Sequence, residues 1–223
     1  MNRIFLTALF VLLLFDSCRS RADRLAVEPP KAPEPVRNPV PYTITDYKNK
    51  IRGGTIPEWV SVWLDSGVHA VENLYVFGDR YVFVARNEAN NFNALNLWKD
   101  GFSAELDFPR LAAARIEERL AAAVDDPYQS YGAFYETLIR AASDFPWTGA
   151  IRIDDFWTFR QFPAGEEGDP EENWEFQILV TIDRTFFSSQ LERIFQIINP
   201  IPPPTRDQRT VIDRVKERFL DGF

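Results

Sequence analysis

The sequence contains a single cysteine and a single histidine among 223 residues. Without a second histidine or cysteine, neither a zinc site nor a nucleophile–base constellation can be assembled from the usual parts. Glycine-rich phosphate-binding motifs and the G-x-S-x-G elbow are also absent from the sequence. We therefore expect a protein that is not an enzyme, with no catalytic residues, no metal site and no cofactor.

Basic residues are outnumbered, with 25 Lys and Arg against 33 Asp and Glu, and the net charge is −8. Nucleic-acid binding usually requires a basic face or stripe, so we expect no nucleic-acid partner. The acidic residues leave a paired-carboxylate hydrolase open as a third reading. Asp154 and Asp155 are the pair of interest, because adjacent strand residues point to opposite faces and one carboxylate would point inward. A hydrogen-bonded carboxylate at a strand end is the interpretation that we favour.

The chain also lacks an apolar run long enough for a transmembrane helix. Its longest run covers residues 4–15 and is interrupted only by Thr7. As a helix it would measure about 18 Å, whereas a bilayer core is about 30 Å thick. This pattern is typical of the apolar region of a secretory signal, and we expect a signal peptide at residues 1–17.

Cys18 follows this segment directly. It is interpreted in three ways: a thiol discarded with the leader, an unpaired thiol on an exported protein, or the lipid-attachment site of a bacterial lipoprotein. The five residues Leu14 to Cys18 resemble a lipobox of the relaxed kind found in spirochaete lipoproteins. We adopt the lipoprotein interpretation, in which Cys18 becomes the mature amino terminus and carries acyl chains that bind the membrane. Residues 18–41 then form a tether whose six prolines favour an extended chain.

Residues 42–199 are long enough for one domain, and the pattern predicts an α+β fold with a small, mainly antiparallel sheet packed against two or more helices. Apolar spacing and capping residues predict helices over 57–68, 107–124, 128–143 and 185–198. The segment 75–86 reads as a strand or hairpin, and the asparagine-rich segment 87–96 reads as a break. Residues 200–223 are expected to form a proline linker and a C-terminal helix, which either packs on the core or docks on a partner.

The clearest strand signal is the alternation of apolar and other residues over 173–183. It places Trp174, Phe176, Ile178 and Val180 inside, with Glu175 and Gln177 exposed or on a partly covered face. Residues 150–162 are its expected antiparallel partner, and four side chains are expected on one face: Ile151, Ile153, Trp157 and Phe159. The acidic loop between the two strands lacks the spacing of a calcium-binding loop. His69 is expected at the end of the first helix, in a surface or capping role.

Three short motifs in this order suggest a family: residues 57–60 (PEWV), 155–157 (DFW) and 179–183 (LVTID). They resemble the twenty-kilodalton bacterial outer-membrane lipoprotein family, and in particular its spirochaete members. The resemblance implies a lipid-anchored protein of the outer membrane, facing the periplasm, with a structural or assembly role and an envelope or flagellar protein partner. The alternative is a periplasmic lipoprotein that binds small molecules or peptides in an aromatic pocket.

Overall fold

The computed structural model describes residues 41–123, 127–163 and 171–198, together with Arg206, Arg209, Thr210 and Asp213. The chain divides into two units, residues 1–40 and 41–223, and all the described residues belong to the second unit. The predicted signal peptide and most of the predicted tether and C-terminal helix therefore lie outside the described residues.

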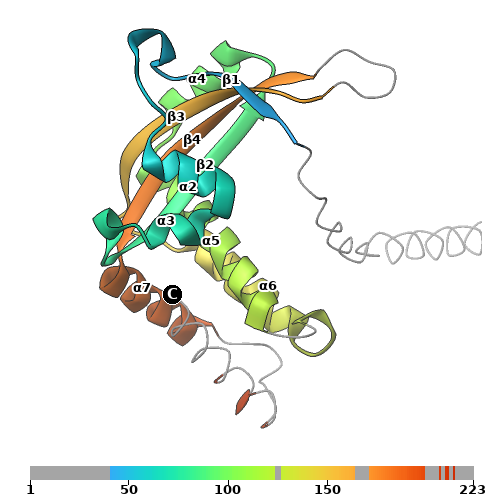
Figure 1. Cartoon of the computed structure of the whole chain (residues 1–223). Coiled ribbons are helices and arrows are strands. Elements are labelled where there is room, and N and C mark those ends of the chain that lie inside the picture. Colours follow the sequence, from blue (N-terminus) through green and yellow to red (C-terminus); the bar gives the residue numbers. More distant parts are fainter. Residues whose placement is uncertain are drawn as a thin grey trace, which may run out of the picture. The chain divides into compact units, whose positions relative to one another are not determined.

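One antiparallel sheet of four strands organises the domain (Figure 1). Its strands are β1 (Thr43–Tyr47), β2 (Arg80–Ala89), β3 (Ile151–Gln161) and β4 (Glu172–Asp183). Their order in the sheet is β1-β3-β4-β2, so β1 and β2 form the two edges. The β3–β4 hairpin predicted from the sequence forms the centre of the sheet.

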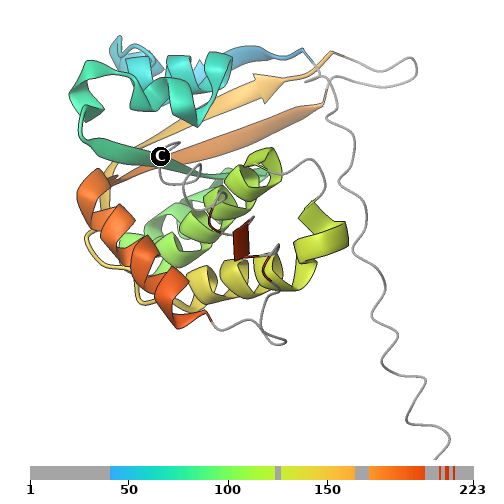
Figure 2. The same cartoon turned by 90° about the horizontal axis from the view of Figure 1, so that it is seen from below.

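Helices cover both faces of this sheet (Figure 2). On one face lie α2 (Glu58–Ser66) and α3 (Val68–Glu72). On the other lie α4 (Phe92–Gly101), α5 (Ala104–Ala123), α6 (Pro127–Asp144) and α7 (Arg184–Ile197). Short 3₁₀ turns occur at Lys50–Arg52 and Tyr75–Phe77. The α+β class predicted from the sequence is confirmed.

Two apolar clusters hold these layers together. The larger cluster lies on the α4–α7 side, where Phe108 and Phe187 are fully buried against Phe83 of β2. The smaller cluster lies under α2 and α3, where Trp59 and Val60 pack with Leu179 and other residues of the sheet. Because β4 contributes to both clusters, it is buried on both faces, as the central strand of a sheet between two helical layers must be.

This two-sided burial shows that one of our predictions was wrong. Phe176, Ile178 and Val180 are buried as expected, but Trp174 is only partly buried, and Glu175 and Gln177 are fully buried. The alternation of residues 173–183 correctly separates the two faces of β4. It does not show that a second layer of helices covers the polar face, because that cover comes from residues distant in the sequence.

A β-bulge in β3 overturns a second prediction. Arg152 pairs with Val180 and Asp154 pairs with Leu179, so Ile153 is an extra residue in the ladder. A bulge changes which face the following residues occupy. Ile151 and Ile153 therefore do not share a buried face with Trp157 and Phe159, and they are 45% and 48% exposed.

The helices follow the predictions closely, with two differences. The helix predicted over 57–68 ends at Ser66, because Gly67 adopts a positive φ of 79°, and the chain then turns into α3. The asparagine-rich segment is not a simple break. The strand β2 continues to Ala89, and the Asn91 side chain accepts hydrogen bonds from the amides of Asn93 and Ala94 at 3.0 and 3.2 Å, which begins α4.

Candidate functional site

Cys18, the predicted lipid-attachment residue, lies outside the described residues. In the part of the chain that the structure describes, none of the helices has the length and hydrophobicity needed to cross a bilayer. The remaining candidates are the ionisable side chains of the domain and the edges and hollows of its surface.

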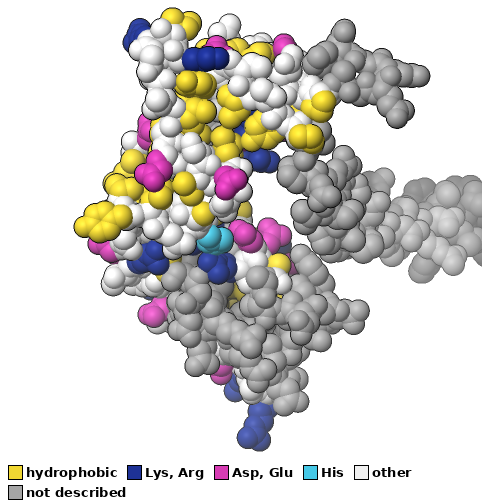
Figure 3. All heavy atoms as spheres, viewed as in Figure 1, with side chains coloured by type: hydrophobic (Ala, Val, Ile, Leu, Met, Phe, Trp, Pro, Cys, Tyr) yellow, Lys and Arg dark blue, Asp and Glu magenta, His cyan; other side chains and the backbone are white. Residues whose placement is uncertain are grey.

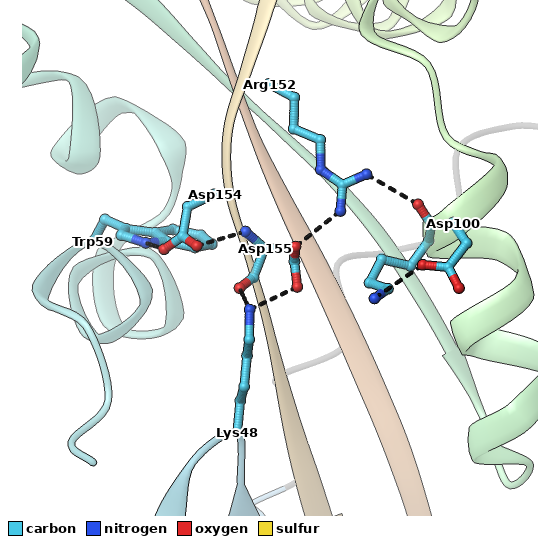
Figure 4. Close-up of polar contacts among 7 residues, drawn as sticks. Lys48, Trp59, Asp100, Arg152, Asp154 and Asp155 are labelled. Atoms are coloured by element: carbon cyan, nitrogen blue, oxygen red, sulfur yellow. Dashed lines mark hydrogen bonds and ion pairs between the residues drawn. The ribbon is translucent and has the colours of Figure 1, made fainter.

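Asp154 and Asp155 lie at the bulge of β3 and point to opposite faces of the sheet (Figure 4). Asp154 turns toward α2, where its Oδ2 accepts a hydrogen bond from Nε1 of Trp59 at 3.0 Å. Asp155 lies between two cations, with Oδ1 2.8 Å from Nζ of Lys48 and Oδ2 2.9 Å from Nη2 of Arg152. The two carboxylates are therefore not brought together around one reacting atom, and each fastens β3 to other parts of the domain.

The electrostatics of Asp155 support this structural role. Burial disfavours its charged form, but the hydrogen bonds and charges of Lys48 and Arg152 outweigh burial, so the pKa of Asp155 is below its usual value. Arg152 also donates from Nη1 to the backbone oxygen of Lys99 at 3.0 Å, which extends the network to α4. The same helix carries an ion pair between Lys99 and Asp100 (Figure 4).

A second group of charged residues is the ion pair between Glu72 of α3 and Arg115 of α5, which closes one end of the β2 edge. Both side chains are buried, and Nη2 of Arg115 lies 2.8 Å from Oε2 of Glu72. Glu72 also accepts the amide of Val82 at 2.7 Å, and Arg115 donates to the carbonyl oxygen of Val82 at 2.9 Å. Burial opposes the charge of Glu72, but Arg115 and this amide outweigh burial and lower its pKa. The pair thus satisfies the outward-facing backbone groups of Val82.

His69 is on α3 beside this pair, not at the end of the first helix. Its Nδ1 lies 3.6 Å from Oε2 of Glu72 and 3.3 Å from Nη2 of Arg119, and its Nε2 lies 3.9 Å from Oε1 of Glu118. The imidazole is partly exposed and bridges α3 and α5. This is the surface role expected from the sequence, at a different place.

A third group of charged residues lies on the same face of the sheet as α2. Glu175 is fully buried, forms an ion pair with Arg160 and lies 3.7 Å from Nη1 of Arg86. Burial raises the pKa of Glu175, although both arginines oppose this effect. Arg160 in turn stacks on Tyr42 just before β1, with its guanidinium carbon 4.2 Å from the ring centroid. The carboxylate is enclosed by its partners, so it has no access to a substrate.

The β2 edge beyond Val82 borders a groove of about 380 Å³. Trp63 and Val68 line it from the α2–α3 side, and Leu111 and Ala114 line it from α5. Its floor is formed by Val82, Phe83 and Val84. Figure 3 shows further hydrophobic side chains on the surface around α2 and the adjoining strands. A second hollow of about 440 Å³ lies beside β1 and includes Asp46, Tyr47 and Trp157.

Sequence reasoning identified Asp154 and Asp155 but missed Glu72, Arg115 and the groove. No group of three or more possible metal ligands is found among the described residues. The acidic loop between β3 and β4 was predicted not to bind calcium, and most of it, residues 164–170, lies outside the described residues. The sequence feature that could have indicated the groove is the strand of residues 80–89, since a strand at a sheet edge needs a partner or a cover.

Comparison with known protein families, with characterised proteins and with solved structures finds no match to this chain.

Proposed function

We propose that this protein is a lipid-anchored component of the cell envelope, with a structural or assembly role that it performs by binding another protein. The observation that carries the proposal is the edge of β2, where the backbone beyond Val82 borders an apolar groove. Strand edges of soluble proteins are normally covered, blocked or paired, because an open edge pairs readily with another chain. The Glu72–Arg115 pair blocks this edge at Val82, and the groove leaves its continuation accessible.

The acidic residues favour binding over catalysis. A general acid or base works best when its pKa is close to the operating pH. Ion pairing lowers the pKa of both Asp155 and Glu72, so both remain charged and engaged with their cations near neutral pH. Glu175 has a raised pKa, but its side chain is 0% exposed and therefore cannot meet a substrate.

Membrane attachment is assigned in this proposal to Cys18, with residues 18–41 as the tether. A single acyl chain binds membranes weakly, whereas the three chains of a bacterial lipoprotein, at about 0.8 kcal/mol for each buried methylene, hold a protein firmly. The proposed location is the outer membrane, with the domain facing the periplasm and an envelope or flagellar protein as its partner.

The anchor is tested with Cys18→Ser in cells. The variant should lose acylation and move from the membrane fraction to the soluble fraction, because no acyl chain would remain to hold it. Mass spectrometry of the mature amino terminus and fractionation after a high-salt wash measure both effects. A serine variant that stays with the membrane, or a mature chain that begins elsewhere, would overturn the lipoprotein proposal.

Partner binding is tested by placing a photo-cross-linking residue at Ala114 in the groove of the protein in its native envelope. Cross-links to a defined envelope protein should form there and be absent from Ala121, an exposed residue of α5 that does not line the groove. Equal cross-linking at both positions would contradict a binding role for the groove. A specific turnover by the purified protein that is lost in Asp155→Asn would contradict the non-enzymatic proposal.

A further inference from the structure

The backbone of β2 alternates between two directions. In an antiparallel ladder, successive residues point their N–H and C=O groups alternately toward the partner strand and away from it. Val82 points away from β4, because its amide and carbonyl bind Glu72 and Arg115. Val84 and Arg86, two and four residues further on, therefore also point outward. Among the described residues, their backbone groups have no hydrogen-bond partner.

The groove lies beside this edge of β2, between two apolar walls that form a slot. The α2–α3 layer supplies Trp63 and Val68 on one side of the sheet plane, and α5 supplies Leu111 and Ala114 on the other. Figures 1 and 2 show β2 between these two helical layers. A strand that entered the slot would lie in the plane of the sheet, about 4.8 Å from β2, with its side chains pointing alternately toward the two apolar walls.

The free groups select the conformation of the occupant. The outward N–H and C=O groups of Val84 and Arg86 can pair with every second residue of an extended chain, which presents both a C=O and an N–H toward β2. A helix interior cannot pair in this way, because its backbone groups already bond to one another. The chain's own tether is a poor match, because proline has no N–H to donate and six prolines lie between Pro29 and Pro41. A second copy of this domain would present a β2 edge that is recessed in the same way, so two such edges would not reach each other.

The charges beside the slot select the occupant further. Arg86 lies at its outer end, and its side chain is 63% exposed although it lies 3.7 Å from the buried Glu175. Glu118, with a side chain that is 64% exposed, lines the α5 wall. Because Arg86 extends from the same face of β2 as Val84, an acidic side chain of the occupant would meet it on the α2 side of the slot.

We propose that the groove binds an extended segment of another protein as a fifth strand beside β2. The segment is apolar where it meets Trp63, Val68 and Leu111, and it carries an acidic residue opposite Arg86. Main-chain hydrogen bonds to Val84 and Arg86 give affinity, and the two walls give specificity. This inference rests on the proposed partner-binding function and specifies how the partner is held.

The test uses the full-length chain in detergent and peptides selected from a random library of linear peptides. Each selected peptide is made again with one backbone N-methyl group, moved one position at a time. Affinity should fall about tenfold at alternate positions, because each methyl there removes a main-chain hydrogen bond and blocks close approach. At the positions between them the methyl points away from β2, and affinity should be retained.

Amide hydrogen exchange gives a second readout on the protein itself. On peptide binding, exchange at Val84 and Arg86 should slow, because their amides acquire acceptors. Exchange at Val82 should be unchanged, since its amide already donates to Glu72.

Two pairs of variants locate the site. Val84→Pro removes the outward amide without touching the ladder to β4 and should abolish peptide binding, whereas Val84→Thr keeps the amide and should bind. Ala114→Glu places a charge in the slot and should weaken binding about tenfold or more, whereas the matched Ala121→Glu should not. The alanine pair decides the question if the proline variant fails to fold.

The inference is overturned if no peptide is enriched, if N-methylation has no alternating effect, or if Ala114→Glu binds like the wild type. It is also overturned if cross-links from Ala114 join two copies of this chain. If these peptide results are negative but Ala114 still cross-links to an envelope protein, the fifth-strand inference is wrong and the proposed partner-binding function is retained. If that cross-linking is absent as well, the fifth-strand inference and the partner-binding function are both wrong.

Discussion

At the scale of the residue, Glu72 contacts three elements of the fold, and nothing in the neighbouring sequence indicates this role. Its carboxylate meets Arg115, which is 43 residues away in the sequence, and the amide of Val82 on the edge strand. Arg115 also lies over the rings of Tyr81 and Phe83, 5.1 Å from each centroid. One buried ion pair therefore joins α3, α5 and β2.

Glu72→Ala should destabilise the domain by about 3–5 kcal/mol, because it leaves the buried Arg115 without its carboxylate. Replacing both residues with methionine should cost less than the single change, since no buried charge then remains unpaired, although Val82 loses its partners. Urea unfolding measures both values. Glu118→Ala, at a side chain that is 64% exposed, is the control and should change stability by no more than about 0.5 kcal/mol. A Glu72 variant as stable as this control would show that the pair contributes little to the fold.

At the scale of the element, local patterns predicted well wherever neighbouring residues decide the structure. Helices α5, α6 and α7 and the β3–β4 hairpin follow from apolar spacing and alternation. The burial of Glu175 and Gln177 could not be predicted in this way, because it depends on residues far away in the sequence; Glu175, for example, is paired with Arg86 of β2, 89 positions earlier. The bulge at Ile153 was also missed, since no glycine or proline marks it in the sequence. Of the candidate site, the sequence indicated the strand but not the groove, which requires the position of β2 at the sheet edge.

The junction between β4 and α7 provides a test at this scale. Asp183 ends the strand and caps the helix, and its Oδ1 accepts the amide of Phe186 at 2.8 Å. Asp183→Ala should cost about 1 kcal/mol, because an amide of the first helical turn loses its acceptor, whereas Asp183→Asn should cost only a few tenths. Chemical denaturation of the three proteins measures the difference. Equal losses in both variants would mean that the charge of Asp183, and not its cap, is what matters.

At the scale of the whole molecule, polar contacts join layers that the apolar clusters hold separately. Glu72 and Arg115 link the α2–α3 layer to α5 around the edge of the sheet, and Asp154 links β3 to α2 through Trp59. Asp155 links β3 to Lys48, just after β1. Since both helical layers are tied to the sheet through carboxylates, the domain as a whole should respond to protonation.

Stability should therefore fall in acid. Glu72 and Asp155 have pKa values lowered from 4.5 and 3.8, so each stabilises the fold fully above its unfolded pKa and loses that contribution as the pH falls through its folded pKa. Glu175 acts in the opposite direction. Its pKa is raised above 4.5, so the folded domain binds this proton more tightly than the unfolded chain, and the resulting stability disappears as the pH rises through its folded pKa.

Asp155→Asn should thus flatten the loss of stability below about pH 4. Glu175→Gln should remove the gain on approaching pH 4.5 from neutral pH, and so steepen the overall decline. Urea midpoints measured from pH 7 to acid for the three proteins test both signs. Parallel curves for wild type and Asp155→Asn would show that the ion pairs of Asp155 do not set the acid limit of this fold.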